Sequence, residues 1–150
     1  MRQVIALATE NVTSGSGGPF AAMVVREGKI IARGVNQVTA TNDPTAHAEV
    51  VAIRAACQAL GTFQLTGCTV YTSCEPCPMC LAALYWSRCD AVYYGNSADD
   101  AAAIGFDDSF LYQQVALPIE DRRLPMHRLL PEEAITSFEA WRNQPNKIEY

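Results

Sequence analysis

The stretch Tyr71-Thr-Ser-Cys-Glu-Pro-Cys-Pro-Met-Cys80 decides the fold, because an apolar strand ends in it and a second apolar segment follows directly. The spacing predicts Cys77 at the N-cap of a helix and Pro78 at the first helical position, where the missing N–H of proline costs nothing. Cys80 then returns to the same side of the helix. Thiolates placed there lie near unpaired backbone N–H groups, which stabilise negative charge. The stretch therefore predicts a metal site.

A second motif, upstream, supplies a histidine and a carboxylate. In Asn42-Asp-Pro-Thr-Ala-His-Ala-Glu49, His47 is followed two residues later by Glu49. A Cys-x-x-Cys pair alone also occurs in thiol redox sites and among buried cysteines, but His-x-Glu followed by Pro-Cys-x-x-Cys is typical of zinc-dependent deaminases of bases. His47, Cys77 and Cys80 would leave one position of a tetrahedral zinc for water, as catalytic rather than structural sites do.

Length and composition favour a single domain over residues 1–150, because 150 residues with 49% hydrophobic content can bury one sizeable core. The apolar run from Val4 to Ala8 is short and Glu10 closes it, so no secretory leader is expected. No segment approaches the roughly 20 apolar residues of a membrane span. The six cysteines are therefore expected to be reduced, in the cytoplasm.

The charge of the chain disfavours a polynucleotide partner. Its formal value is −5, and the eleven basic residues are scattered, with only Arg122 and Arg123 adjacent. Such a surface attracts phosphate backbones poorly. A small-molecule partner is expected, with neither a nucleic acid nor a membrane.

The N-terminal segment is expected to form a helix and a β-hairpin. Helical spacing is seen in Val4, Ile5, Ala8 and Val12. The glycine-rich stretch 14–19 lacks the GxGxxG spacing of a phosphate-binding loop, so a turn is expected. The β-rich runs 20–26 and 29–35 meet at Glu27-Gly28, which predicts the hairpin.

A polar loop over 36–42 then leads to a second helix. Asp43 and Pro44 predict its N-cap and first residue, and Gly61 stops it after Leu60. The helix would carry the motif histidine and glutamate in its first turns, at an end that can face a cleft. Its buried stripe is predicted to comprise Ala46, Val50, Ile53, Cys57 and Leu60.

Strands and helices alternate in the next segment. Strands are predicted at 68–73 and 91–95, with an apolar helix at 79–86 between them. This alternation predicts a parallel sheet covered by helices on both faces.

The C-terminal third is predicted to be less regular. Ser97 would cap a short helix through Ile104, and an exposed acidic-aromatic loop would follow at 106–110. Prolines at 118, 125 and 131 punctuate an extended connection. A last helix is predicted from Pro131, and the spacing of its apolar residues indicates that one face packs against another part of the protein.

Three motifs together resemble the guanine deaminases of bacteria, within the cytidine deaminase-like superfamily: Pro44-Thr-Ala-His-Ala-Glu-Val50, Thr72-Ser-Cys-Glu-Pro-Cys-Pro-Met-Cys80 and Gly105-Phe-Asp-Asp-Ser-Phe110. The first two are shared across the superfamily; the third, with the ending from Trp141 to Tyr150, is similar to the guanine branch. The resemblance implies an α/β fold, a three-layer α/β/α sandwich with a five-stranded mixed sheet. It also implies a homodimer that exchanges C-terminal segments, about 111–150.

The chemistry expected of this family is hydrolytic deamination of guanine to xanthine and ammonia. Zn²⁺ held by His47, Cys77 and Cys80 would lower the pKa of a bound water towards about 7. Glu49 would not bind the metal. It would move a proton from the water to the ring and then to the leaving ammonia.

By resemblance, five residues would contact the substrate. Asn36 would hydrogen-bond the ring, Phe20 and Trp86 would flank it, Asp108 would accept from its N–H groups, and Tyr150 of a partner chain would close the site. A carboxylate suits an edge that presents N–H donors. From composition alone, the two flanking aromatics could equally pack in the core, and Asp108 could be a solvated loop charge.

The motifs also allow alternative interpretations. Cys74 is either a fourth ligand that closes the site or a buried neighbour of it. An iron–sulfur run would need a cysteine where Leu84 stands. A structural zinc module would have no use for Glu49. Within the deaminases, guanosine, cytosine and transfer-RNA adenosine are alternative substrates, and the acidic balance disfavours the last.

Overall fold

The computed structural model describes residues 1–149, so Tyr150 lies outside the described residues. The chain divides into two compact units, Met1–Phe110 and Leu111–Tyr150. The N-terminal unit contains the sheet and both predicted motifs. Among residues 1–149, no helix is long and apolar enough to cross a membrane.

The sheet is mixed, and its four strands lie in the order β2-β1-β3-β4. These strands are β1 (Ala21–Arg26), β2 (Lys29–Val35), β3 (Cys68–Cys74) and β4 (Ala91–Asn96). β1 runs antiparallel to both of its neighbours, and only β3 and β4 are parallel.

The expected fifth strand is not found within the described chain, so that prediction is wrong. After β4 the chain forms α5 (Ala98–Ala103), α6 (Ser109–Ala116), the 3-10 helix η1 (Ile119–Asp121) and α7 (Pro131–Asn143). Within residues 97–149 the chain forms only these helices and the connections between them, and no strand pairs with the outer edge of β4. The mixed character of the sheet is confirmed, because the predicted β1–β2 hairpin adds antiparallel pairs to the parallel pair of β3 and β4.

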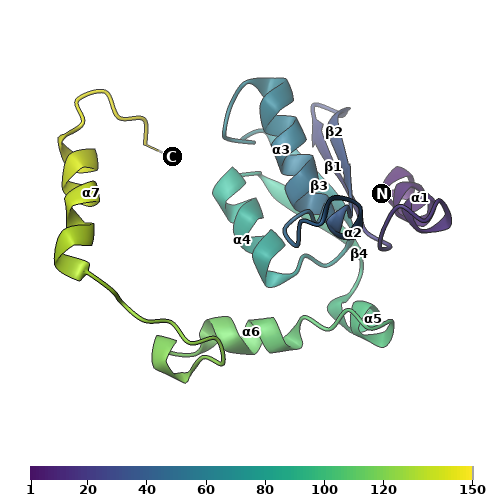
Figure 1. Cartoon of the computed structure of the whole chain (residues 1–150). Helices are drawn as coiled ribbons and strands as arrows, with labels where there is room; N and C mark the ends of the chain where they lie inside the picture. Colours follow the sequence, from purple (N-terminus) through teal and green to yellow (C-terminus); the bar gives the residue numbers. More distant parts are fainter. Residues whose placement is uncertain (150) are drawn as a thin grey trace. The chain divides into compact units, whose positions relative to one another are not determined.

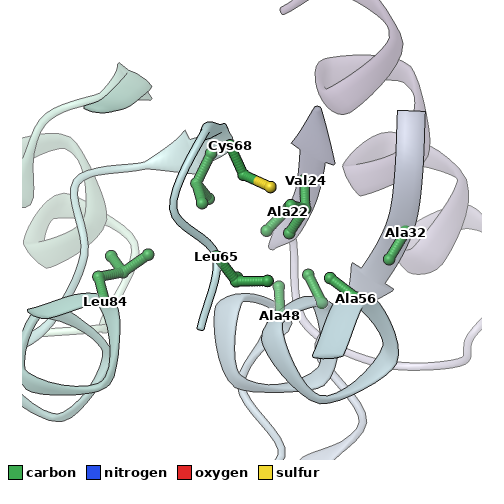
Figure 2. Close-up of a cluster of buried hydrophobic side chains, with 10 residues drawn as sticks. Ala22, Val24, Ala32, Ala48, Ala56, Leu65, Cys68 and Leu84 are labelled. Atoms are coloured by element: carbon green, nitrogen blue, oxygen red, sulfur yellow. The ribbon is translucent and has the colours of Figure 1, made fainter. Parts of the chain in front are cut away.

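Helices cover both faces of the sheet, which makes three layers (Figure 1). α1 (Arg2–Thr13) packs on one face through Val4 and Ala8, against Ala21 and Met23 of β1. α3 (Ala48–Leu60) and α4 (Pro78–Ser87) cover the other face. There the alternate β1 residues, Ala22 and Val24, meet α3 (Figure 2). Because successive side chains of a strand point to opposite faces, β1 contributes side chains to two hydrophobic clusters, one on each face of the sheet.

Small residues set how closely α3 approaches the sheet. A side chain at Gly34 of β2 would collide with backbone atoms of Ala48 and Ala52. The buried face of α3 comprises Ala48, Glu49, Ala52 and Ala56. The buried face of α3 therefore differs from the predicted one. Its alanines allow close contact with β2, whereas Val50, Ile53 and Cys57 lie half-buried at the edges of this face.

The start of α3 also differs from the prediction. Asp43 does not cap the helix: its Oδ1 accepts hydrogen bonds from the backbone N–H and hydroxyl of Thr45, at 2.8 and 2.7 Å. This turn delays the helix, so His47 becomes the N-cap residue, with extended backbone. The four-residue helix α2 (Val38–Thr41) forms in the segment predicted as a loop.

Several local predictions are confirmed. Glu27 and Gly28 both have positive φ, as a two-residue hairpin turn requires. Cys77 is the N-cap of α4 and Pro78 its first residue. Ser97 caps α5 through a reciprocal pair of hydrogen bonds with Asp100.

The C-terminal unit carries most of α6, η1 and α7. α6 begins at Ser109, inside the predicted loop, because the Asp107 carboxylate accepts from the backbone N–H of Ser109 at 2.8 Å. α7 begins at Pro131 as predicted. The unit leaves large apolar side chains exposed, among them Leu129, Leu130 and Phe138.

Candidate metal centre and active-site cavity

The N-caps of α3 and α4 bring the predicted ligands together. Nδ1 of His47 lies 3.6 Å from Sγ of Cys77 and 3.5 Å from Sγ of Cys80. The three ligand atoms all lie within 4.8 Å of one another. Imidazole nitrogen and thiolate sulfur are the donors that zinc prefers, and three of them leave one tetrahedral position open. The residues present therefore fit a catalytic zinc ion.

The ligand side chains shift one another's pKa values. A hydrogen bond from Cys80 lowers the pKa of the Cys77 thiol far below its usual range, and His47 adds to this effect. The same hydrogen bond raises the pKa of Cys80. The contact with Cys77 raises the pKa of His47. One thiolate is thus available at the start of α4 to receive a metal ion.

Cys74 lies beside this cluster but is not part of it. Within residues 1–149, the groups able to hold a metal comprise only His47, Cys77 and Cys80. The Cys74 thiol donates instead to the carbonyl of Ser97, at 3.5 Å. Burial raises the pKa of Cys74 to about 11, which keeps it a neutral thiol. This geometry favours the buried neighbour over the fourth ligand.

Glu49 occupies the first turn of α3 with only 6% of its surface exposed. Its Oε1 accepts a hydrogen bond of 2.9 Å from the hydroxyl of Thr72. Burial is the main cause of its raised pKa. A buried carboxyl group with a raised pKa, held beside the candidate metal ligands, is suited to proton transfer.

A cavity of about 250 Å³ opens over these groups. It is lined by Gly18, Phe20, Asn36, Val38, Thr39, His47, Glu49, Cys74, Glu75, Cys77, Ala101, Phe106 and Asp108. The rings of Phe20 and Phe106 meet edge to face, with centroids 4.9 Å apart. Asp108 is half-buried, and burial raises the pKa of its carboxyl, with the negative charge of Cys77 adding to the rise.

The cavity brings together some, but not all, of the predicted substrate residues. Phe20, Asn36 and Asp108 line it, together with two of the metal ligands and Glu49. Trp86 does not appear among its lining residues and is 68% exposed on α4. Tyr150 lies outside the described residues.

Sequence reasoning missed Thr72 and Phe106. Thr72 had a detectable signal, because Cys68, Val70, Thr72 and Cys74 alternate along β3 and the first two face the core. A hydroxyl on that face needs a polar partner, which Glu49 provides. Phe106 stood in the predicted exposed loop, and its contact with Phe20 has no local sequence signal.

Comparison with known proteins places the chain in a family. The model of the cytidine and deoxycytidylate deaminase zinc-binding region matches residues 1–96. The chain belongs to this deaminase family. Zinc is the metal of the family region, which agrees with the His-Cys-Cys donor set of the deaminase.

The deaminase has a full-length curated relative. The guanine deaminase of Bacillus subtilis (strain 168) is 53% identical over 150 residues, covering 100% of this chain and 96% of that protein. The crystal structure of guanine deaminase from Bacillus subtilis matches with a TM-score of 0.97 and 54% identity, over 99% of this chain and 95% of that one.

A second group of relatives matches less of the deaminase. The tRNA-specific adenosine deaminase of Agrobacterium fabrum is 43% identical over 86 residues, which is 57% of this chain and 57% of that protein.

Proposed function

We propose that the chain is a zinc-dependent guanine deaminase that hydrolyses guanine to xanthine and ammonia in purine metabolism in the cytoplasm. The observation that carries this proposal is the 53% identity to the Bacillus subtilis guanine deaminase over the full chain. The size of the cavity agrees with it. About 250 Å³ lies below the roughly 300–1,000 Å³ of typical ligand pockets, so a free base fits better than a nucleoside.

His47, Cys77 and Cys80 would hold the zinc ion. When bound, zinc lowers the pKa of a coordinated water towards about 7 and so supplies hydroxide at neutral pH. Glu49 takes up a proton at Oε2, because Oε1 already accepts from Thr72. This proton comes from the water and passes to the ring nitrogen beside C2, the carbon that bears the amino group, as the water oxygen bonds to C2. Glu49 then takes the proton of the new C2 hydroxyl group and gives it to the amine, and the C2–N bond breaks to leave a carbonyl group and ammonia. One water is consumed, and one ammonia leaves for each guanine.

The cavity residues suit recognition of a purine base. Phe20 and Phe106 offer apolar contacts to a flat ring. Asp108 can accept from ring N–H groups, and Asn36 can donate to a ring acceptor. Trp86 and Tyr150 remain proposed contacts on the strength of the family resemblance.

A panel of substrates tests the proposal. Guanine, guanosine, cytosine, adenine and a transfer-RNA anticodon stem-loop are incubated separately with zinc-loaded protein, and released ammonia is measured. Guanine is expected to turn over fastest. A clearly faster reaction with cytosine, guanosine or the RNA would overturn the assignment of substrate, and metal binding without any ammonia release would leave only a zinc-binding module.

Replacing Asp108 with alanine is expected to raise KM for guanine at least tenfold, because the cavity loses a carboxylate that can accept from the N–H groups of the base. The melting temperature should fall by no more than a degree or two, since substitutions away from the core usually cost about 0.5 kcal/mol or less. Steady-state kinetics and thermal melting measure the two effects.

Asp107→Ala is the matched control for Asp108. The Asp107 carboxylate is engaged with the backbone of Ser109 and does not appear among the cavity residues. It should therefore leave KM close to the parent. Equal effects of the two substitutions would show that the loop as a whole, rather than the Asp108 carboxylate, decides binding.

We further propose that the protein is a homodimer with exchanged C-terminal segments. Two exposed apolar surfaces support this proposal. α4 exposes Tyr85 and Trp86, and the C-terminal unit does not bury Leu129 or Phe138 within itself. A second copy of the chain could cover both surfaces. Sedimentation as a dimer is expected, and a monomer at micromolar concentration would contradict the proposal.

Mixing two defective chains tests whether the exchanged tail closes the site in trans. A chain lacking residues 148–150 and a Glu49→Gln chain should each be nearly inactive. Mixed dimers should recover part of the guanine turnover, because one of their two sites combines an intact Glu49 with an intact tail. The absence of recovery after proven subunit exchange would exclude closure by the partner's tail.

A further inference from the structure

The side chain of Asn11 occupies an unusual position for a polar residue. Asn11 lies near the end of α1, outside the motifs of the metal site, and only 5% of its surface is exposed. Its Nδ2 donates two hydrogen bonds, to the carbonyl of Gly18 at 2.8 Å and to the carbonyl of Asn36 at 3.0 Å. Both amide hydrogens are thus used to join segments that are separate in sequence.

The two carbonyl groups belong to the segments that form one wall of the cavity. Gly18 and Phe20 line the cavity from the glycine-rich turn, and Asn36 lines it from the end of β2. These segments also bond directly, because the backbone N–H of Asn36 donates to the carbonyl of Phe20 at 3.0 Å. The backbone of Asn36 is therefore held at its N–H by Phe20 and at its carbonyl by Asn11.

Gly17 shows how closely this arrangement is packed. A Cβ atom at position 17 would collide with the carbonyl oxygen of Asn36 and would lie 3.0 Å from Nδ2 of Asn11. The backbone N–H groups of Ser16 and Gly17 both donate to the carbonyl of Asn11. The glycine-rich turn thus wraps around Asn11, which gives the turn a function other than phosphate binding.

The same backbone positions determine what the Asn36 side chain presents to a ligand. Its Oδ1 accepts from the backbone N–H of Val38 at 3.3 Å. This contact determines the orientation of the Asn36 side-chain amide, with Oδ1 towards Val38. The NH₂ group then points away from Val38 and is available as a donor. Guanine has acceptor ring nitrogens and an exocyclic carbonyl oxygen that can accept from such a donor.

We propose that Asn11 is a positioning residue of the active site: its amide holds the backbones of Asn36 and of residues 18–20 at the spacing that a bound base requires. This inference rests on the proposed deamination of guanine. Asn11 does not line the cavity, so it acts through Asn36 and Phe20. Because these two residues line the cavity and are not among the candidate metal ligands, the expected kinetic effect is on KM.

Two substitutions of Asn11 test the proposal. Asn11→Leu keeps the approximate volume and removes both donors, and Asn11→Ala also removes most of the side chain. Each is expected to raise KM for guanine about tenfold or more, to keep kcat within about threefold, and to retain one zinc per chain. Kinetics are measured well below the melting temperature of each variant, with zinc determined by elemental analysis.

Ser87→Ala is the matched control for the loss of a buried hydrogen bond. The Ser87 hydroxyl is buried and donates to the carbonyl of Leu84 at 2.8 Å, at the end of α4 and away from the cavity lining. It should lower the melting temperature without changing KM. If the Asn11 variants behave like Ser87→Ala, or if neither folds while Ser87→Ala does, Asn11 supports only the fold and the proposal is overturned.

A double-mutant cycle identifies the residue through which Asn11 acts. In a chain that already carries Asn36→Ala, adding Asn11→Leu should raise KM much less than it does in the parent, because the group that it positions is gone. Independent, fully additive effects would contradict action through Asn36. If the unsubstituted protein turns over another base in place of guanine, the proposed function is refuted. If the unsubstituted protein is active on guanine and the Asn11 variants have an unchanged KM, only the positioning role of Asn11 is refuted.

Discussion

Replacement of Glu49 by glutamine is expected to lower guanine turnover by about 10²–10⁴-fold, the usual contribution of a positioned proton-transfer group. Glutamine keeps the shape of the side chain, and its amide oxygen can still accept the hydrogen bond that Thr72 donates to Glu49. It lacks a group that can take up a proton at neutral pH. Ammonia release under saturating guanine measures the loss.

The Glu49→Gln protein should remain folded and should still bind one zinc per chain, because Glu49 is not in the ligand cluster. Burial raises the pKa of Glu49, so the metal-free folded state holds the ionised carboxylate at a cost in stability above the unfolded pKa. A neutral amide removes this cost, and the melting temperature of the metal-free protein should not fall at neutral pH.

Glu75→Gln provides the control for a carboxylate in the same cavity. Glu75 lines the cavity, but its Oε2 accepts from the backbone N–H of Ala98 at 3.2 Å, a role that an amide oxygen can fill. The turnover of the Glu75→Gln protein should stay within a few-fold of that of the unsubstituted protein. If Glu49→Gln also stays within a few-fold, Glu49 does not carry the proton.

Replacement of Cys77 by serine is expected to abolish turnover by removing the metal. Serine is nearly the same size, but its hydroxyl is not a thiolate and binds zinc poorly. Zinc content should fall from one per chain to nearly none after dialysis against a weak chelator. Elemental analysis and ammonia release are measured on the same sample.

The Cys74→Ser variant tests whether Cys74 is a metal ligand or only a buried neighbour of the ligands. Cys74 is buried beside the cluster and donates to the carbonyl of Ser97, which a serine hydroxyl can also do. This variant should keep one zinc per chain and most of the activity. Loss of zinc from Cys74→Ser would mean that four protein ligands close the site, which is incompatible with a zinc-activated water.

Much of the site was predictable because its residues stand at positions with strong local rules. Cys77 and Pro78 mark the start of α4 by capping chemistry alone, and Glu27-Gly28 marks the hairpin by its backbone conformation. The His-x-Glu and Cys-x-x-Cys spacings predicted a cluster that the fold then assembled. These rules act over a few residues, and a single sequence contains them completely.

The sequence by itself therefore determined the three candidate metal ligands, the carboxylate beside them and the deaminase family. Tertiary structure alone decided the start of α3 at His47, the sheet of four strands among the described residues, the bond from Thr72 to Glu49, and the two bonds of Asn11. The Thr72–Glu49 pair is separated by 23 residues and the Asn11–Asn36 pair by 25, so no local pattern encodes either contact. Both contacts form because a buried polar group must find a partner, and the packing of α1 and α3 on the sheet determines which partner lies within reach.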